Sequence, residues 1–442
     1  MPIRWALPGA LAGVGLLALA GTVAAFTVGT GGGSTRTASG PAGVASSSPA
    51  RSSIPDPIGA DIAKQQDTVR ATPANYGAWA SLGLDYVQQA KITVDPSYYP
   101  KAEAVLKKSL SINTSSNFEA MAGEAALKAA EHDFTGALSW ARRGLKLNPY
   151  NANLYGSLND ALTQLGRYPE AFAAAQKMND LQPGVAAFTR AEYVFELRGD
   201  ISNARLAMRQ ALASSTAPAD KAFAYYYLGE LSFNAGDPKT DLTLCETGLT
   251  IDPSYYPLIQ GKARAEAALG RTDAATRDYA AVVNAVPQPE YVVEYGEYLQ
   301  SLGRMKEAQQ QYTVFDTENK LFQANGVTLD TDPTLFYANH GNPALALKYG
   351  KVGIRIRPFI EMDDAYAWAL HVNHRDAEAL VWEKKAMALG TRNALFHYHA
   401  GMIHKALGNK TQAKAELTEA LAINPHFNPL AAPLARTALA GL

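Results

Sequence analysis

The sequence has 442 residues, more than a single hydrophobic core usually serves, so we expect several domains or a repeat array. Its 40 basic and 41 acidic residues give a net charge of -1, which lacks the basic excess that nucleic-acid binding requires. A single cysteine excludes an internal disulfide, a zinc–thiolate cluster and a redox pair within the chain.

The chain opens with an uncharged apolar stretch from Trp5 to Val28, longer than the roughly 20 residues that cross a bilayer. Residues 1–28 are therefore predicted to be a signal-anchor transmembrane helix, with a signal peptide cut after Ala25 as the alternative. Arg4 precedes the stretch and Arg36 is the next basic residue, which favours a cytoplasmic N-terminus. We expect a single-pass, membrane-anchored protein with an extracytoplasmic body, or a protein secreted after signal cleavage.

Residues 29–57 follow as Gly, Ser and Pro with few large apolar side chains, so we predict a disordered linker. Beyond it the sequence repeats itself. Prolines close apolar helical stretches about every 34 residues, at Pro149, Pro183, Pro218, Pro253 and Pro287.

Side chains inside each period fit two packed helices. Trp79, Leu82, Gly83 and Tyr86 share one helical face because they are three or four residues apart. A small residue such as Gly83 at the eighth position of the period lets two helices approach closely. Turns such as Leu165-Gly166-Arg167 supply the left-handed residue that ends a helix. The stretch from 321 to 358 is the least regular, and its Asn325-Gly326 and Asp332-Pro333 predict turns.

This pattern resembles the tetratricopeptide repeat (TPR), whose W-x2-L-G-x2-Y signature residues 79–86 match in full. The chain is similar to long bacterial TPR proteins with an N-terminal signal or anchor segment and no assigned biochemical role. The strongest stretches of this resemblance are 365–370, 389–394, 398–403 and 424–427. The resemblance implies an all-α TPR-type solenoid, a right-handed superhelix of about ten helix-turn-helix units. We place the solenoid at residues 58–425 and a capping segment at residues 426–442.

The resemblance also implies a protein-binding scaffold whose first helices line a concave groove. The repeat register assigns twelve residues to that groove. They are Asn153, Asp160, Thr189, Tyr193, Glu196, Tyr226, Glu230, Phe233, Gln260, Arg264, Glu297 and Gln300. The carboxylate clamp of one TPR subclass needs Lys, Asn and Arg at fixed inner positions. Because residues such as Ala80, Leu84 and Ala126 stand there, its acidic peptide ligand is not transferred to this chain.

Six of the eight histidines lie in the last 72 residues, and His397 and His404 share one helical face. Packing and turn roles explain most of them, so we predict no metal site and no cofactor, with metal binding by these histidines as the alternative. Cys245 falls where the second helix of its unit packs inward, which predicts a buried, inert thiol. No nucleophile elbow, zincin, phosphate-loop or calcium-loop motif occurs, so an enzyme is not expected.

These observations favour a membrane-tethered TPR scaffold that binds a protein or peptide partner in its groove. The alternative is an extracytoplasmic accessory protein that binds a small molecule, a glycan or a metal ion for a transporter. A long open polar and aromatic groove would favour the first function. Clustered acidic or histidine side chains in a closed pocket would favour the second.

Overall fold

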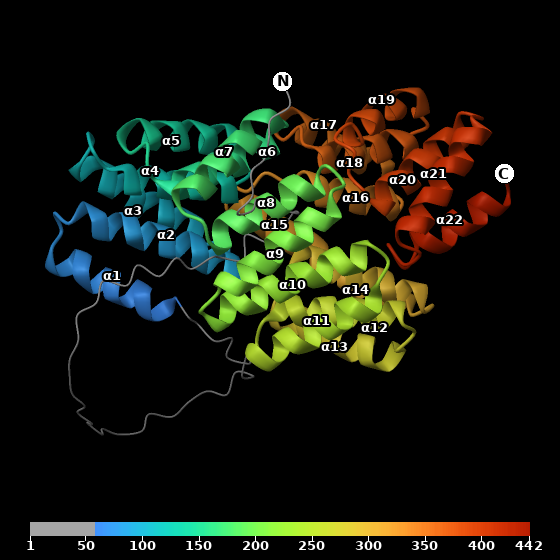
Figure 1. The fold of residues 1–442 in the computed structure, drawn as a ribbon, viewed down its shortest axis with the longest axis horizontal. Coiled ribbons are helices and arrows are strands. Elements are labelled where there is room, and N and C mark those ends of the chain that lie inside the picture. The colour runs from blue at the N-terminus through green and yellow to red at the C-terminus, as the bar shows by residue number, and fades with distance from the viewer. Residues whose placement is uncertain (1–57) are drawn as a thin grey trace.

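The computed structural model describes residues 58–442 (Figure 1). Every regular element within this range is an α-helix, and no strand forms in it. The helices are α1 (Gly59–Ala71), α2 (Tyr76–Thr93), α3 (Tyr98–Ile112), α4 (Phe118–Ala130), α5 (Phe134–Leu147), α6 (Ala152–Gln164), α7 (Tyr168–Leu181), α8 (Val185–Glu196), α9 (Ile201–Ser214), α10 (Pro218–Asn234), α11 (Pro238–Ile251), α12 (Tyr256–Ala268), α13 (Thr272–Ala285), α14 (Pro289–Ser301), α15 (Met305–Ala324), α16 (Thr331–Asn339), α17 (Pro343–Ile356), α18 (Ile360–Val372), α19 (Asp376–Ala386), α20 (Ala394–Ala406), α21 (Lys410–Ile423) and α22 (Ala431–Ala440).

The helices pack in sequential pairs, from α2 with α3 through α20 with α21, and each pair packs on the next. Helix α1 precedes the first pair, and α22 covers the last one with Ala432, Ala435 and Ala438. This arrangement confirms the predicted all-α, TPR-type solenoid. Its stability comes mainly from contacts between neighbouring pairs, since a single pair cannot bury its apolar face alone.

Capping side chains and small residues explain why the pairs form. Asn75, Asn117 and Asn151 begin α2, α4 and α6, and each side-chain oxygen accepts a backbone N–H from the first turn of the helix. At the predicted eighth position, a Cβ on Gly83 would lie 2.5 Å from Cγ of Leu106 in α3. A larger residue there would therefore push the paired helices apart.

Two turns of the solenoid pack on each other along a line that we call the seam (Figure 1). At the seam, the turns inside the pairs α4–α5, α6–α7, α8–α9 and α10–α11 contact later loops at residues 328–330, 357–361, 390–392 and 423–425. The hydrogen bonds between these turns and loops join residues 191 to 198 positions apart, as in Asn424 to Phe233 and His132 to Asp330. That separation equals between five and six repeats.

Turn glycines show where the seam runs. Gly166, Gly199 and Gly236 have φ between 66° and 79°, and so have Gly270 and Gly303 further along the chain, at 74°. A Cβ on Gly166 would lie 2.3 Å from the carbonyl oxygen of Pro358, and those on Gly199 and Gly236 would also approach backbone oxygens of later loops. A Cβ on Gly270 or Gly303 would meet no atom within 4 Å. Only the first three therefore serve both the local turn and the seam.

A buried ionic cluster anchors the seam. Arg357, which is 3% exposed, donates from Nη1 to Asp330 at 2.9 Å and from Nε to Gln164 at 2.7 Å. His132 Nδ1 lies 3.0 Å from the other oxygen of Asp330. Burial opposes ionisation of Asp330, but Arg357 and His132 outweigh it and hold the pKa of this carboxyl below its usual range. The guanidinium also lies 4.2 Å from the ring centroid of Phe359.

Residues 327–330, between α15 and α16, bring the irregular stretch of the sequence into the seam. Gly326 has φ +90°, so the turn predicted at Asn325-Gly326 is present. Val327 joins the core of the first pairs, and the Thr328 amide donates to the Glu131 carbonyl at 3.3 Å. The turn predicted at Asp332-Pro333 is wrong, because both residues lie in the first turn of α16, where proline is tolerated.

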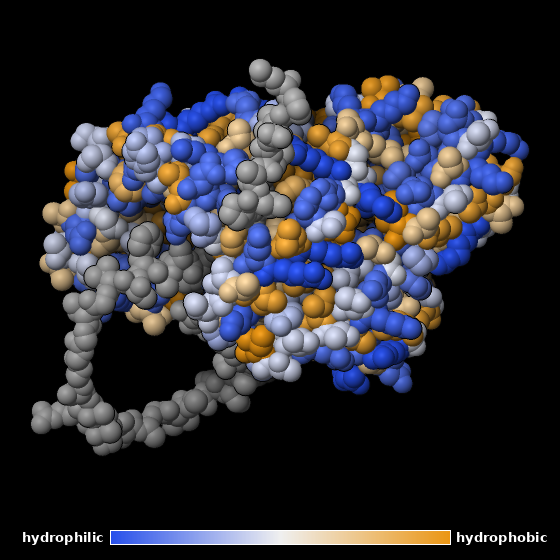
Figure 2. Space-filling view, in the orientation of Figure 1, coloured by the Kyte–Doolittle hydropathy of each residue, from blue (hydrophilic) through white to orange (hydrophobic). Residues whose placement is uncertain are grey.

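The predicted membrane-anchored localisation is corrected by the structure. No helix between residues 58 and 442 is long and apolar enough to cross a membrane. The longest, α15, has 20 residues, and several of them are charged, among them Lys306, Asp316 and Lys320. The segment 1–28 and the linker 29–57, on which the prediction was based, lie outside the described residues. On the face drawn in Figure 2, the described residues show small hydrophobic areas separated by hydrophilic ones.

Candidate binding surface

One row of charged side chains follows the first helices of five successive pairs. Each member occupies the ninth position of its repeat, next to the residue at which the paired helices approach. The row is Asp160 on α6, Glu192 on α8, Glu230 on α10, Arg264 on α12 and Glu297 on α14. We call the faces of α8, α10, α12 and α14 that carry this row the inner surface.

Arg264 is the central cation of the inner surface. Its guanidinium forms a two-pronged ion pair with Glu230, with Nη1 at 3.2 Å from Oε2, and Nη2 lies 3.8 Å from Oδ2 of Asp241. The guanidinium also stacks over Phe233 with its carbon 4.1 Å from the ring centroid. These contacts bring together three of the predicted groove residues, Glu230, Phe233 and Arg264.

A second contact group links α12, α13 and α14. The Gln260 amide and the Tyr279 hydroxyl both donate to the carboxylate of Glu294, the latter at 2.8 Å. Burial raises the pKa of Glu294. On α10, the predicted groove residue Tyr226 packs edge-on against Tyr227, with ring centroids 5.2 Å apart.

Glu192 differs from the other members of the row because neither carboxyl oxygen has a hydrogen-bond partner among the described residues. It is 1% exposed. Its neighbours in the row are already paired, Asp160 with Arg190 at 2.6 Å and Glu230 with Arg264. Burial, followed by repulsion from Glu196 and Glu230, raises the pKa of Glu192 well above its ordinary value. An unpaired buried carboxyl group is costly in free energy, because its lost contacts with water are not replaced.

Three further carboxyl groups around Glu192 and Arg264 resist ionisation. Burial raises the pKa of Glu196 to about 7, and repulsion from Glu361 and Glu230 adds to the effect. Burial also raises the pKa of Asp241 to about 7, against the attraction of Arg264. Glu290, on α14, is raised well above its ordinary value by burial and then by Asp332. The inner surface thus contains more carboxyl groups than Arg264 can neutralise.

Contacts at and beside the seam use some of the predicted groove residues. The Tyr193 hydroxyl donates to Glu361 of α18, 168 positions away. Glu297 accepts from Asn428 at 2.7 Å, and its other oxygen lies 3.2 Å from His340 Nε2. These side chains hold successive turns of the solenoid together instead of lining an open groove.

The other predicted groove residues have local partners or face solvent. Thr189 donates to the Val185 carbonyl of its own helix at 2.7 Å. Gln300 accepts from Tyr312 at 2.8 Å, and Asn153 is exposed near the start of α6.

Sequence reasoning missed Glu192, the member of the row whose carboxyl group has no hydrogen-bond partner in the described part of the chain. In α8 it selected the neighbours Thr189, Tyr193 and Glu196. The ninth-position rule that finds Asp160 and Glu230 also finds Glu192, if Ala191 is taken as the eighth residue of its repeat. The roles of Glu294 and Glu361 depend on contacts with other helices, so no spacing rule within one repeat identifies them.

Several histidines and the cysteine occupy paired or buried positions, whereas His374 and His426 are exposed. His371, His397 and His399 each hydrogen-bond one carboxylate, those of Asp376, Glu416 and Asp364. No group of three potential metal ligands occurs within residues 58–442. Cys245 is fully buried, and burial followed by Asp241 raises the pKa of its thiol.

Comparison with known proteins identifies one repeat directly. A sequence model of the tetratricopeptide repeat matches residues 394–427, which span α20 and α21. No curated protein matches the chain.

Three solved structures are similar to the chain at low sequence identity. The human IFIT1 dimer with PPP-AAAA aligns at 14% identity over 82% of this chain and 85% of that chain, with a TM-score of 0.44. The APC/C hetero-tetramer Cut9-Hcn1 aligns at 15% identity over 85% and 95%, with a TM-score of 0.34. Naa15/Naa10 bound to HypK-THB aligns at 16% identity over 84% of this chain, with a TM-score of 0.27. The chain spans 61% of that last structure's length.

Proposed function

We propose that this TPR-type solenoid is a non-catalytic scaffold that holds a protein partner through a basic segment of the partner. The contact lies on the inner surface, where a lysine or arginine side chain of the partner pairs with Glu192 and its neighbours. The observation that carries the proposal is the buried, unpartnered carboxyl group of Glu192 in a row whose other members are paired. TPR units in general bind proteins, which supports the same class of function by analogy of fold.

The charge balance of the inner surface favours a cationic ligand. Glu230 and Asp241 lie beside Arg264, and Glu192 and Glu196 lie close enough to Glu230 to be repelled by it. A ligand cation would favour the ionised form of Glu192 and so lower its pKa, because opposite charges stabilise each other. Binding therefore releases protons, and the affinity rises as pH increases from 5 to 8.

The absence of catalysis is part of the proposal. Cys245 is buried with a raised thiol pKa, so it lacks the thiolate character that a nucleophile requires. Glu294 on α14 is hydrogen-bonded to both Gln260 and Tyr279, so its carboxyl group is held in place and is not free to act as an acid or base. Turnover of a hydrolase substrate that disappears in the Glu192→Gln variant would contradict this part.

Site-specific photocrosslinking tests the binding surface. A benzophenone amino acid replaces half-buried Tyr226 on the inner surface or, as the matched control, Tyr150, which is 77% exposed between α5 and α6. We expect position 226 to crosslink a basic segment of a partner in native cells, and mass spectrometry identifies that segment. Adding Glu192→Gln to the position-226 protein should reduce the yield at least tenfold. Capture of the same proteins from both positions, or of a segment without basic residues, would contradict the proposal.

A further inference from the structure

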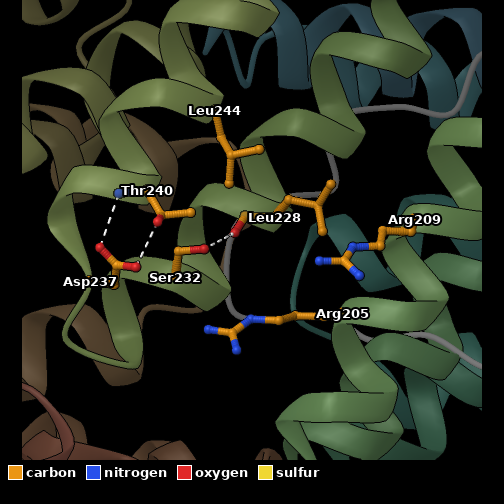
Figure 3. A pocket seen from close by; sticks show the side chains of 7 residues that line it. All are labelled: Arg205, Arg209, Leu228, Ser232, Asp237, Thr240 and Leu244. Atoms are coloured by element: carbon orange, nitrogen blue, oxygen red, sulfur yellow. Dashed lines mark hydrogen bonds between the residues drawn. The ribbon is translucent and has the colours of Figure 1, made fainter.

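A second, chemically opposite site lies between α9, α10 and α11, in a pocket whose lining side chains are drawn in Figure 3. The volume of the pocket is about 290 Å³. Leu228 of α10 and Leu244 of α11 give it apolar walls. Leu228 follows Tyr226 by two residues, and Ser232 follows Glu230 by two residues. Residues two apart point to opposite sides of a helix, so the pocket lies on the other side of α10. The pocket is therefore separate from the inner surface.

Two arginines from one helix face this pocket. Arg205 and Arg209 are four residues apart on α9, so they share one face and lie about 6 Å apart at Cβ. Arg205 donates one hydrogen bond, to the Leu231 carbonyl at 3.3 Å, and keeps its other donors. Arg209 is exposed and forms no ion pair or hydrogen bond within the part of the chain that the structure describes. Helix α9 contains no acidic residue that could neutralise either guanidinium.

The acidic side chain that lines the pocket, Asp237, already has hydrogen-bond partners in its own helix. Asp237 caps α11, and its two oxygens accept from the Thr240 amide at 3.1 Å and the Thr240 hydroxyl at 2.6 Å (Figure 3). These two hydrogen bonds, with a smaller contribution from Arg205, keep the pKa of Asp237 below its ordinary value. Asp237 is thus ionised and held in place by its own helix, and it forms no ion pair with either arginine.

We propose that this pocket binds a carboxylate group of an acidic peptide segment, with an adjacent apolar side chain against Leu228 and Leu244. The two guanidinium groups and the Asp237 carboxylate together carry one net positive charge. A ligand with a single carboxylate would neutralise this charge, whereas a phosphate dianion would leave the pocket with a net negative charge. Guanidinium groups bind carboxylates in a planar, two-pronged geometry. The volume lies at the lower end of small-molecule sites, which suits one or two residues of a peptide.

Fluorescence anisotropy with the full chain tests this assignment. The probe is labelled Gly-Leu-Glu-Leu-Gly with an amidated C-terminus, and the reference is the same peptide with Gln in place of Glu. We expect the Glu peptide to bind at least tenfold more tightly. A Gln peptide with a free C-terminus shows whether a terminal carboxylate serves as well as a side-chain carboxylate. A phosphoserine peptide that binds more tightly than the Glu peptide would overturn the carboxylate assignment.

Variants locate the site. Arg209→Gln should weaken binding of the Glu peptide at least tenfold, and because Arg209 is exposed and unpaired, the substitution leaves the fold intact. Arg205→Gln should have a similar effect, with circular dichroism to check its folding. Arg277→Gln, at an exposed arginine of α13, is the matched control and should not change the affinity. Glu192→Gln should not change it either, which separates this site from the inner surface. Equal affinities for wild type and Arg209→Gln would overturn the proposal.

Discussion

Burial raises the pKa of several carboxyl groups in this protein, and Glu361 is one of them. Its carboxylate accepts a hydrogen bond from Tyr193, yet burial raises its pKa to about 7. The ordinary pKa of glutamate is about 4.3. Between about pH 4.3 and about pH 7, Glu361 is therefore protonated in the folded state but ionised in the unfolded state. The unfolding free energy therefore falls as pH rises through this window and is level above it.

Replacement of Glu361 by Gln should remove this pH dependence while keeping an acceptor for Tyr193. At pH 5 we expect wild type and variant to unfold at similar urea concentrations. At pH 8 the variant should be more stable by up to about 3 kcal/mol, since each pH unit in the window contributes about 1.4 kcal/mol. The measurement is urea unfolding at both pH values.

Glu246→Gln is the control, because Glu246 is exposed on α11. It should behave like wild type at both pH values. A Glu361→Gln protein whose stability relative to wild type stays the same at pH 5 and pH 8 would contradict the assigned role of burial.

Residues of the inner surface could be predicted from the sequence only where the position within one repeat determines which way the side chain points. Asp160, Glu230 and Arg264 were found because each follows the small or close-packed position of its repeat. Glu192 was missed because α8 has an irregular register, with 32 residues separating it from Asp160 and 38 separating it from Glu230. The unpartnered state of its carboxyl group depends on what Asp160 and Glu230 bind, which sequence spacing does not specify.

Helix pairs are the elements that the sequence specifies best, and their turn glycines allow a direct comparison. Gly166 and Gly303 occupy equivalent turns with φ of 66° and 74°. Alanine at either position should cost about 1 kcal/mol or more from the left-handed backbone alone. At Gly166 the new Cβ would also lie 2.3 Å from the carbonyl oxygen of Pro358, whereas at Gly303 it would meet nothing.

We therefore expect Gly166→Ala to be clearly more destabilising than Gly303→Ala in urea unfolding. It should also increase hydrogen exchange at residues 357–361, because the seam must open to admit the methyl group. Gly303→Ala should leave exchange there unchanged. Equal losses of stability in the two variants would argue against a tight seam at this turn.

At the scale of the whole molecule, the seam turns a row of repeats into a closed arrangement. Its buried centre is Arg357, which joins Asp330 and Gln164. Replacement of Arg357 by Gln leaves Asp330 without its main partner, and breaking a buried ion pair of this kind typically costs about 3–5 kcal/mol. We expect a larger radius of gyration in small-angle X-ray scattering and an earlier unfolding transition.

Arg375→Gln is the control, since Arg375 forms an exposed pair with Glu378 and should change neither quantity. Lowering the pH should destabilise the fold in the same way as the Arg357→Gln substitution. The lowered pKa of Asp330 contributes stability that is present above its ordinary value near 3.8 and is lost as pH falls through the lower, folded-state value. An Arg357→Gln protein with unchanged scattering would contradict the role given to the seam.

The seam itself could not be predicted from the sequence. A 34-residue period indicates which residues meet inside a pair and between neighbouring pairs. Contacts such as Asn424 with Phe233 depend on the cumulative rotation between more than five pairs, and a small change in each step would move them apart. The irregular stretch at 321–358 is visible in the sequence as a weak repeat. It departs from the repeat because residues 327–330 contact the first helix pairs and the turn between α4 and α5.

Contact between successive turns also limits how this protein can change in length. Open repeat arrays gain or lose whole modules easily, because each module touches only its neighbours. Here, an extra module inserted between Gly166 and Pro358 would shift every later loop by one step and misalign all the cross-turn hydrogen bonds beyond it. The copy number of this architecture is therefore fixed by geometry, and duplication or deletion of a single module is tolerated only near the two chain ends.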